Sequence, residues 1–336
     1  MQEPNLSSSV ESGTPLLELK NLCVHFETSA GLARAVDGID LQLQPGETLA
    51  LMGESGCGKS LTALAIMGLL PRADGIMESG DVRFQGRSLR DLSHLSSLRG
   101  QRLAMIFQDP SSALNPVFSV GEQIAEVLRC KLGMGRREAR AQAVQELGRV
   151  GIPDPEERQR WYPHQLSGGM QQRVMIAMAM CTRPALLIAD EPTTALDVTV
   201  QSEILSLIGQ LSESNGMGVL LITHDLGVVA ENADHVAVMY AGKIVEYAAV
   251  DRLIEAPRHP YTKLLLRALP QLTPAGEPLL SIAGSVPAAT EFPSGCRFRT
   301  RCPLAQERCA TQEPASVPSE IDAPVACHFP EQVAAL

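Results

Sequence analysis

The stretch that decides the fold is Gly53-Glu54-Ser55-Gly56-Cys57-Gly58-Lys59-Ser60. A short, continuous apolar run from Thr48 to Met52 precedes it, as expected for a strand buried on both faces, and Leu61 to Leu70 has the pattern of a helix. A strand, a Gly-x4-Gly-Lys-Ser loop and a helix in this order are the context that a phosphate-binding loop requires. We therefore expect an α/β nucleotide-binding domain.

Each residue type in this loop has a physical reason to be there. Glycines allow backbone N–H groups to converge on phosphate oxygens without an intervening Cβ. Lys59 is expected to reach the β and γ phosphates, and the Ser60 hydroxyl to ligate Mg²⁺. The candidate nucleotide-contacting residues are Gly53, Ser55, Gly56, Cys57, Gly58, Lys59, Ser60 and Leu61.

A second acidic element completes the candidate catalytic site. The apolar run that begins at Pro184 ends in Asp190 and Glu191, as a buried strand would if it delivered two carboxylates beside the phosphate loop. Asp190 is expected to hold Mg²⁺ through water, and Glu191 to polarise the attacking water as a general base. Taken alone this could be a solvated acidic turn; the phosphate loop favours the catalytic interpretation.

Leu166-Ser167-Gly168-Gly169-Met170 resembles the signature loop of ABC transporter ATPases, and Met170 departs from the Gln usual at the last position. Ser-Gly-Gly at the start of a helix forms a second anion site. The resemblance implies that Ser167, Gly168 and Gly169 face the γ-phosphate held by the other subunit of a head-to-tail dimer.

Further elements of the same family follow in order. Gln108 is similar to the Gln that senses Mg²⁺ and links to the membrane partner, and Asp197 lies in a segment that resembles the loop crossing the dimer interface. His224 resembles the switch histidine that contacts the γ-phosphate and orients Glu191, and Phe26 looks like the aromatic residue that stacks on adenine. The resemblance implies ATP hydrolysis with Glu191, His224 and Gln108 as catalytic residues, and Mg²⁺ bound through Ser60, Gln108 and Asp190.

The implied fold is a P-loop NTPase of the ABC cassette type, with a RecA-like core, an antiparallel β subdomain and a helical subdomain at about 110–180. The segments 107–116 and His259-Pro260-Tyr261-Thr262-Lys263, the latter followed by a helix through Leu269, resemble the dipeptide, oligopeptide and nickel importers. We divide the chain into a flexible tail (1–14), an ATPase domain (15–255) and a C-terminal domain of the peptide-importer type (256–336).

Four of the eight cysteines gather near the end of the chain, at Cys296, Cys302, Cys309 and Cys327. Four thiolates suit tetrahedral Zn²⁺ or an iron–sulfur cluster, and free thiols are the third interpretation. The short Cys-x2-Cys unit usual in zinc ribbons is absent. The resemblance to peptide importers implies a [4Fe–4S] cluster, with zinc as the alternative. Arg297, Arg299 and Arg301 would then balance the cluster charge, or else form a solvated basic run.

Composition excludes other classes. Of the 336 residues, 28 are Lys or Arg and 38 are Asp or Glu, a net charge of −10, which argues against a duplex-DNA binder. The longest apolar runs fall well short of the roughly 20 residues of a membrane span, and the first residues lack the pattern of a signal peptide. We expect a cytosolic chain with reduced cysteines, whose transport pore would belong to other proteins.

The resemblance therefore implies the ATP-hydrolysing subunit of a dipeptide or oligopeptide importer, peripheral on the cytoplasmic face of the inner membrane. The implied partners are a second, distinct ATPase subunit, two permease subunits and a separate substrate-binding protein, with no nucleic acid. The alternatives are a nickel or other small-solute importer of the same branch, and a soluble ABC ATPase. Intact Glu191 and His224 argue against a non-enzymatic cassette.

Overall fold

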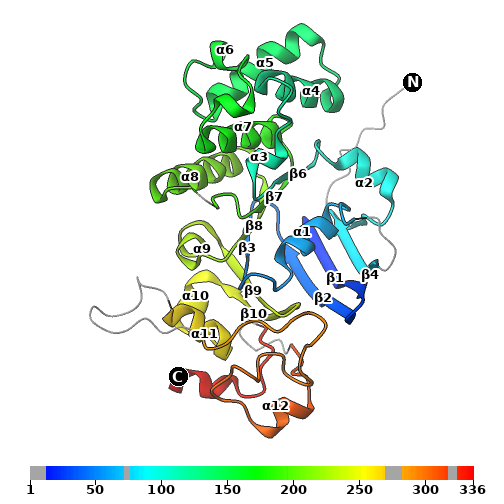
Figure 1. The fold of residues 1–336 in the computed structure, drawn as a ribbon, viewed down its shortest axis with the longest axis vertical. Coiled ribbons are helices and arrows are strands. Elements are labelled where there is room, and N and C mark those ends of the chain that lie inside the picture. Colours follow the sequence, from blue (N-terminus) through cyan, green and yellow to red (C-terminus); the bar gives the residue numbers. More distant parts are fainter. Residues whose placement is uncertain (1–12, 72–75, 195, 269–281, 317–323) are drawn as a thin grey trace.

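The computed structural model describes residues 13–71, 76–194, 196–268, 282–316 and 324–336. In this part of the chain the strands form two sheets, one mostly parallel and one antiparallel, and helices gather at one end of the molecule (Figure 1). The expected α/β class is therefore confirmed. Of the expected N-terminal tail, residues 1–12 lie outside the described residues.

The mostly parallel sheet carries the candidate site. Its strand order is β10-β9-β3-β8-β7-β6, and only the β9–β10 pair is antiparallel. The central strands are short and apolar because both of their faces are covered, and every residue of β7 and β8 is buried. The strands are β3 (Thr48–Met52), β6 (Leu103–Ile106), β7 (Leu186–Asp190), β8 (Gly218–Thr223), β9 (His235–Tyr240) and β10 (Lys243–Ala249).

The antiparallel sheet lies beside the first one and packs on helix α1 (Lys59–Ile66). In β1 the buried leucines, Leu17, Leu19 and Leu22, share a core with apolar residues of α1. This alternation is typical of a sheet with one covered face. The strands are β1 (Leu17–Thr28), β2 (Gly31–Leu43), β4 (Ile76–Phe84) and β5 (Arg87–Ser88), in the order β2-β1-β4-β5.

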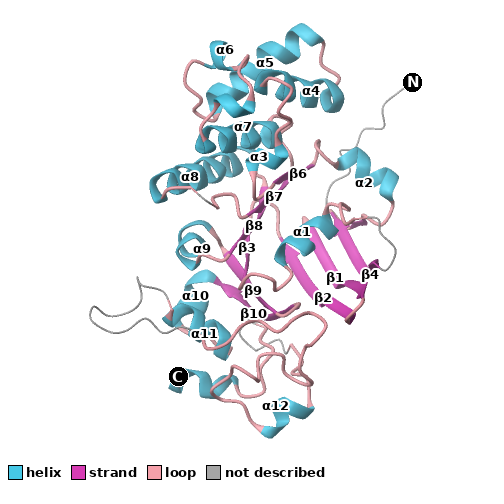
Figure 2. Cartoon of the chain, in the orientation of Figure 1, coloured by secondary structure: helices cyan, strands magenta, loops and turns pink. Residues whose placement is uncertain are grey.

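Helices between β6 and β7 form a separate lobe, drawn at the top of Figure 2. Ser119 caps α4 by accepting a hydrogen bond from the N–H of Glu122, and Gly133 ends that helix in the left-handed conformation. The lobe comprises α3 (Pro110–Ala113), α4 (Val120–Leu132), α5 (Arg136–Arg149), α6 (Pro155–Arg158), η1 (Pro163–Gln165) and α7 (Gly168–Met180).

The remaining helices flank the sheets or belong to the end of the chain. They are α2 (Leu92–Leu98), α8 (Val198–Asn215), α9 (Leu226–Asn232), α10 (Val250–Glu255), α11 (Pro260–Arg267), α12 (Glu307–Thr311) and η2 (Pro330–Ala335). We call residues 256–336 the accessory segment. Its described part is mostly loop, lies at the end of the molecule opposite the helical lobe, and packs on β9 and β10 through Tyr261 and Phe298.

The expected helix from Leu61 to Leu70 differs from the observed one. Helix α1 begins at Lys59 and ends at Ile66, because Gly68 adopts a left-handed conformation (φ 58°) and the N–H of Leu69 turns back to the carbonyl of Leu64 at 2.8 Å. The helix expected to continue through Leu269 ends at Arg267, and Leu269 itself lies outside the described residues.

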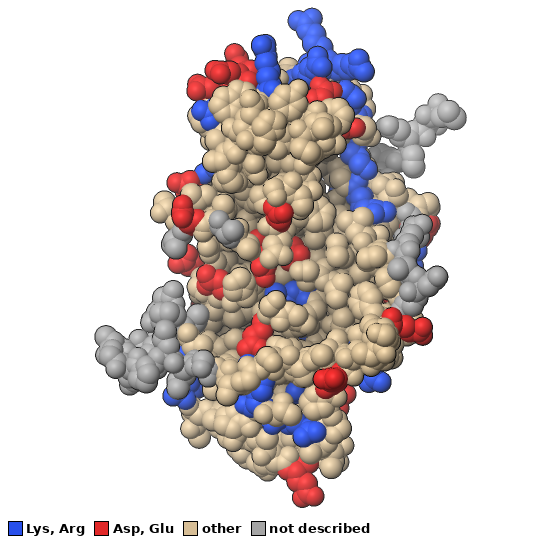
Figure 3. Space-filling view, in the orientation of Figure 1, with Lys and Arg blue, Asp and Glu red and all other residues tan. Residues whose placement is uncertain are grey.

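No helix in the described part of the chain is both long and apolar enough to cross a bilayer. On the face drawn in Figure 3, basic side chains gather at the two ends of the molecule, and the middle is largely uncharged with scattered acidic groups.

Candidate functional site

The phosphate loop joins the carboxyl end of β3 to the first turn of α1 and is shaped by its glycines. Gly58 has φ 113°, and a Cβ there would lie 2.5 Å from the carbonyl oxygen of Ala35 and 2.6 Å from Cε of Met239. A larger residue would clash as well as strain the backbone. The glycine at 58 is therefore required by the close approach of β2 and β9.

A pocket of about 550 Å³ opens over this loop. It brings together groups from five separate parts of the chain: the loop itself, the end of β6, the end of β7, the end of β8 and helix α11. The lining residues are Met52, Gly53, Glu54, Ser55, Gly56, Gly58, Lys59, Ser60, Leu61, Gln108, Glu191, His224 and Leu265.

Lys59 and Ser60 are aimed across the floor of this pocket. The Lys59 ammonium, 5% exposed, donates to the carbonyl oxygens of Gly53 at 2.8 Å and Glu54 at 3.1 Å. The Ser60 hydroxyl donates to Oδ1 of Asp190 at 3.1 Å. Burial raises the pKa of the Asp190 carboxyl, and the neighbouring Glu191 charge adds to that rise. A hydroxyl facing a buried carboxylate is a donor set of the kind that Mg²⁺ prefers, so these residues fit that ion.

Three polar side chains around the pocket lie within hydrogen-bond distance of the Glu191 carboxylate. Its Oε2 accepts hydrogen bonds from the Gln108 amide and from the Thr194 hydroxyl, each at 3.0 Å, and its Oε1 lies 3.2 Å from Nδ1 of His224. The residue has φ 45°, in the left-handed region, at the turn that leaves β7. Both carboxylate oxygens are thus oriented, as a general base requires.

The signature-like loop does not reach this pocket. Ser167 caps α7 by accepting the N–H of Met170 at 3.4 Å, and Gly168 and Gly169 form its first turn. Asp197 stands exposed at the N-cap of α8. None of these four residues lines the pocket.

Two other predicted contact residues also lie away from the pocket lining. Phe26 is half-buried on β1 and packs against the core shared with α1. The Cys57 side chain is fully buried under the loop, with its sulfur 3.9 Å from Nζ of Lys59. Burial raises the pKa of the Cys57 thiol.

Three residues of the accessory segment approach the phosphate loop, and no sequence motif assigned them to the site. Leu265 lines the pocket, the Tyr261 hydroxyl accepts the N–H of Glu54 at 2.9 Å, and Arg301 forms an ion pair with Glu54 at 2.6 Å. The signal in the sequence was weak: an aromatic residue inside the His-Pro-Tyr-Thr-Lys motif and arginines beside cysteines.

The four C-terminal cysteines surround one small cavity, together with His259, Phe298 and His328. Burial raises the pKa of the Cys302 thiol to about 12 and of the Cys327 thiol to about 11, and the N–H of Phe329 points at the Cys327 sulfur at 3.4 Å. Although all four residues are described, no three of their sulfurs lie within 4.8 Å of one another. The four sulfurs are therefore gathered more loosely than the ligands of a single tetrahedral ion.

The interpretation as a solvated basic run is wrong for Arg297 and Arg301, whose side chains are buried. Arg297 is buried and binds the Asp37 carboxylate and the Ala241 carbonyl, and Arg301 pairs with Glu54. These two cations therefore pair with carboxylates of the ATPase domain, and charge balance for a cluster stays a prediction. Arg299 donates to the Ser294 carbonyl at 2.9 Å.

Cys23, His25 and Asp37 also cluster, with their potential ligand atoms within 4.8 Å. Burial alone would raise the pKa of Asp37, but Arg297 and Lys243 lower it. His25 Nε2 is 2.9 Å from the same carboxylate. Because this carboxylate already faces two cations, the cluster is an ion-pair network that joins β1 and β2 to the accessory segment.

The fold and the pocket together define a P-loop ATPase of the ABC type. Residues 36–194 match the family model described as ABC transporter, and residues 245–309 match that described as oligopeptide/dipeptide transporter, C-terminal region. The chain belongs to the ABC transporter ATP-binding proteins, in the branch that carries this C-terminal region.

Full-length relatives support the assignment. The dipeptide transport ATP-binding protein DppD of Escherichia coli is 47% identical over 317 residues, with 94% of this chain and 97% of the relative covered. The oligopeptide transport ATP-binding protein AppD of Bacillus subtilis is 46% identical over 319 residues, with the same coverage. A putative peptide import ATP-binding protein of Brucella melitensis is 49% identical, with 90% of this chain and 94% of the relative covered.

Solved structures agree on the cassette. The ATP-binding cassette MJ0796, a dimer in a post-hydrolysis state bound to ADP and Pi, superposes with a TM-score of 0.62 at 29% identity, covering 70% of this chain and 98% of that one. The protein cbiO1 of Clostridium perfringens gives a TM-score of 0.60 at 26% identity, covering 72% and 91%. The chain is an ATP-hydrolysing cassette that uses ATP and Mg²⁺.

Proposed function

We propose that this chain is the ATP-hydrolysing subunit of a dipeptide or oligopeptide ABC importer. The observation that carries the proposal is the convergence of Gln108, Thr194 and His224 on the Glu191 carboxylate beside the phosphate loop, in a chain that continues into the peptide-transporter C-terminal region. Relatives named for dipeptide and oligopeptide transport match it over almost their whole length.

In this proposal each group around the pocket has a distinct role. Lys59 and the backbone N–H groups of the loop bind the phosphates, and Phe26 stacks on the adenine. Ser60, Asp190 and Gln108 hold Mg²⁺, which neutralises charge on the phosphate oxygens when it is bound. Glu191 accepts a proton from the attacking water while His224 orients the carboxylate.

The signature-like loop supports a head-to-tail dimer. The pocket of this chain is not lined by Ser167, Gly168, Gly169 or Asp197. The first three lie at the start of the 13-residue helix α7, where backbone N–H groups favour an anion such as phosphate. We infer that these residues complete the site of a second ATPase subunit, a distinct paralogue that returns the same contacts.

A groove of about 770 Å³ between the helical lobe and the core suits a permease partner. Leu69, Phe107 and Phe118 line it and are 38%, 38% and 48% exposed. Because Gln108 directly follows Phe107, a short helix from a permease loop seated here would sense the state of the ATP site. In this proposal the chain lies on the cytoplasmic face of the inner membrane and works with two permease subunits and a separate substrate-binding protein.

For the cysteine cavity we propose a [4Fe–4S] cluster rather than zinc. A four-iron cluster spreads its ligand sulfurs more widely than one ion bonded to each sulfur at about 2.3 Å, and the sulfurs of Cys296, Cys302, Cys309 and Cys327 are not drawn into one tight group. Anaerobically purified protein should be brown and absorb near the visible–ultraviolet boundary. Stoichiometric zinc without iron would reject the cluster.

The function is tested in membrane vesicles that contain this chain, its partner ATPase and two permeases. We expect ATP hydrolysis to rise when the binding protein is added with a dipeptide, and to be lost in Glu191→Gln. Stimulation by Ni²⁺ and not by peptide would favour a nickel importer. Full activity without permeases, and no stimulation in their presence, would indicate an ABC ATPase not coupled to transport.

A further inference from the structure

Tyr261 and Arg301 of the accessory segment both bind one residue of the phosphate loop, Glu54. The backbone N–H of Glu54 donates to the Tyr261 hydroxyl at 2.9 Å. Its carboxylate receives both terminal nitrogens of Arg301, at 2.6 Å and 3.0 Å. We call these three residues the loop clamp. A bidentate pair of this kind fixes orientation as well as distance.

Arg301 is held in place before it meets Glu54. Its Nε donates to the carbonyl of Ala283 at 2.9 Å, and its guanidinium lies over the rings of Tyr240 and Phe298, at 5.8 Å and 6.0 Å from their centroids. The side chain is 5% exposed. Because the guanidinium is already oriented, little freedom is lost when the carboxylate binds.

Tyr261 is equally well fixed. Its ring is fully buried and packs against the rings of Tyr240 and Phe298, at centroid distances of 4.7 Å and 5.3 Å. Burial raises the pKa of its hydroxyl, which therefore stays neutral and accepts the Glu54 N–H. The residue preceding it by two, His259, caps helix α11 with Nδ1 on the Tyr261 N–H at 3.1 Å.

Glu54 also contacts Lys59, the phosphate-binding lysine of the loop. The carbonyl of the same residue accepts a hydrogen bond from Nζ of Lys59 at 3.1 Å. One residue thus connects Arg301 and Tyr261, both in the accessory segment, to the ammonium that binds phosphate. Leu265, one turn after Tyr261 on α11, lines the pocket itself.

We propose that Tyr261 and Arg301 are positioning residues for ATP binding, so that the accessory segment is a working part of the ATP site. The clamp holds the loop in the shape that receives phosphate, and pre-ordering a loop lowers the free-energy cost of binding. The inference rests on ATP binding to this loop and is independent of the transported solute.

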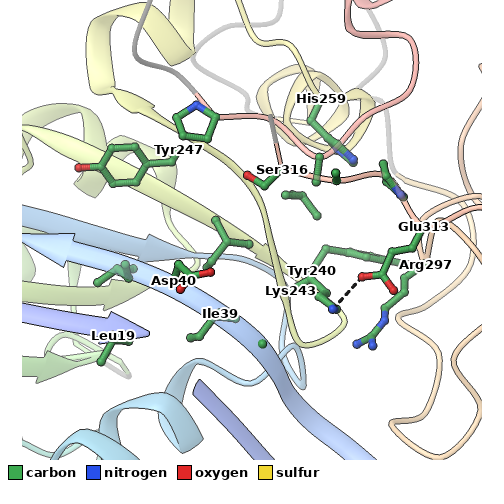
Figure 4. Close-up of a pocket in the computed structure, with 18 of the residues that line it drawn as sticks. Leu19, Ile39, Asp40, Tyr240, Lys243, Tyr247, His259, Arg297, Glu313 and Ser316 are labelled. Atoms are coloured by element: carbon green, nitrogen blue, oxygen red, sulfur yellow. Dashed lines mark ion pairs between the residues drawn. The ribbon is translucent and has the colours of Figure 1, made fainter. Parts of the chain in front are cut away.

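A second docking point of the accessory segment provides a matched control. A cavity of about 640 Å³ lies between β2, β10 and this segment. Lys243 and Glu313, drawn as an ion pair in Figure 4, approach to 2.7 Å beside it. There Arg297 binds Asp37 and the Ala241 carbonyl. Like Arg301, Arg297 is a buried arginine that joins the segment to the ATPase domain, but it does not contact Glu54.

The test measures binding of a fluorescent ATP analogue with Mg²⁺ to the full chain carrying Glu191→Gln, and KM and kcat of the assembled transporter. We expect Arg301→Ala to weaken binding about tenfold, equivalent to about 1.4 kcal/mol, and to raise KM with little change in kcat. Tyr261→Phe keeps the ring and removes the acceptor, so a smaller loss is expected. Arg301→Lys should recover part of the loss, because it retains one charge contact.

A double-mutant cycle decides whether Arg301 acts through Glu54. If it does, Glu54→Ala with Arg301→Ala should bind ATP no more weakly than the worse single variant. Arg297→Ala should lower the melting temperature yet leave ATP affinity within about twofold. The proposal is overturned if Arg301→Ala binds ATP like the wild type, if Arg297→Ala weakens binding equally, or if the losses from Glu54→Ala and Arg301→Ala add.

Should Arg301→Ala fold poorly, Tyr261→Phe and Arg301→Lys decide the same question, and wild-type affinity in both would overturn the proposal.

Discussion

The phosphate pocket and the four-cysteine cavity are both built from loops, but they obtain their order from different sources. The phosphate loop is strung between β3 and α1, whose apolar residues belong to buried cores of the ATPase domain. The cysteine loops follow no long element, and α12 spans only five residues. They are joined to the ATPase domain through the ion pairs of Arg297 and Arg301. The difference shows that a loop can be positioned by regular structure or by ion pairs.

The largest effect is expected at the phosphate pocket, from Glu191→Gln. This change keeps the hydrogen-bonding shape and removes the base, so hydrolysis should fall by about 10²–10⁴-fold while ATP binding persists. Steady-state ATPase assays measure the first effect, and size-exclusion chromatography with ATP should detect a trapped dimer. Exposed Glu255→Gln is the control. Unchanged turnover would remove Glu191 from the mechanism.

Gly58→Ala tests whether regular structure alone orders the phosphate loop. The added Cβ would lie 2.5 Å from the Ala35 carbonyl, at a left-handed position, so ATP affinity should fall at least tenfold, by about 1.4 kcal/mol or more. Binding of a fluorescent ATP analogue measures this loss. Gly135→Ala, where a Cβ would meet no atom within 4 Å, should bind ATP normally. Equal affinity in both variants would contradict the packing argument.

Cys309→Ser tests the other source of order. Cys309 is buried, and its carbonyl accepts the N–H of Cys296 at 2.8 Å. If the proposed cluster is bound, loss of one of its four ligands should release most of the metal and lower the melting temperature of the accessory segment. Metal analysis and calorimetry measure the two effects. Cys130→Ser, at an exposed position on α4, should retain both. A metal content equal to that of the wild type would exclude Cys309 as a ligand.

The smallest expected effect concerns Glu246, a residue of β10 that binds the accessory segment. This carboxylate, 2% exposed, accepts the N–H groups of Arg258 at 2.7 Å and His259 at 3.0 Å. Burial raises its pKa above the ordinary 4.5. The folded state therefore holds this proton more tightly than the unfolded state, and the associated stability is lost as pH rises through the folded pKa.

Denaturant titrations between about pH 4.5 and pH 8 measure this effect, because that range starts at the ordinary pKa of a glutamate and extends upward. Stability should fall across this range, because the proton that the folded state holds more tightly is released as pH rises. The loss should vanish in Glu246→Gln, while Glu255→Gln should behave like the wild type. A loss of the same size in Glu246→Gln would assign it to other groups.

Much of the fold followed from local patterns. The strand expected at Thr48–Met52 is observed with the same bounds. This segment is a short apolar run that ends at the first glycine of the phosphate loop, so its signal is local. Strand β4, with Glu78, Gly80 and Asp81 in its middle, was not predicted, because its pairing with β1 overrides weak strand propensity.

The residues of the candidate site also fall into those that local sequence patterns predicted and those that only the structure revealed. The motif residues Lys59, Glu191 and His224 were assigned from the sequence because their chemistry belongs to short patterns next to strands. Tyr261 and Arg301 were not, because they lie more than 200 residues from Glu54 along the chain. No local pattern encodes a contact between such distant segments.

By itself the sequence determined the nucleotide chemistry of this protein, since glycines, a lysine and carboxylates at fixed spacing beside buried strands permit little else. The tertiary structure alone decided what the accessory segment touches. The reason is physical: Arg297 and Arg301 carry long flexible cations that could serve as sulfur counter-charges, surface groups or ion-pair partners. Only the folding of the segment against β2, β10 and the phosphate loop places Asp37 and Glu54 within their reach.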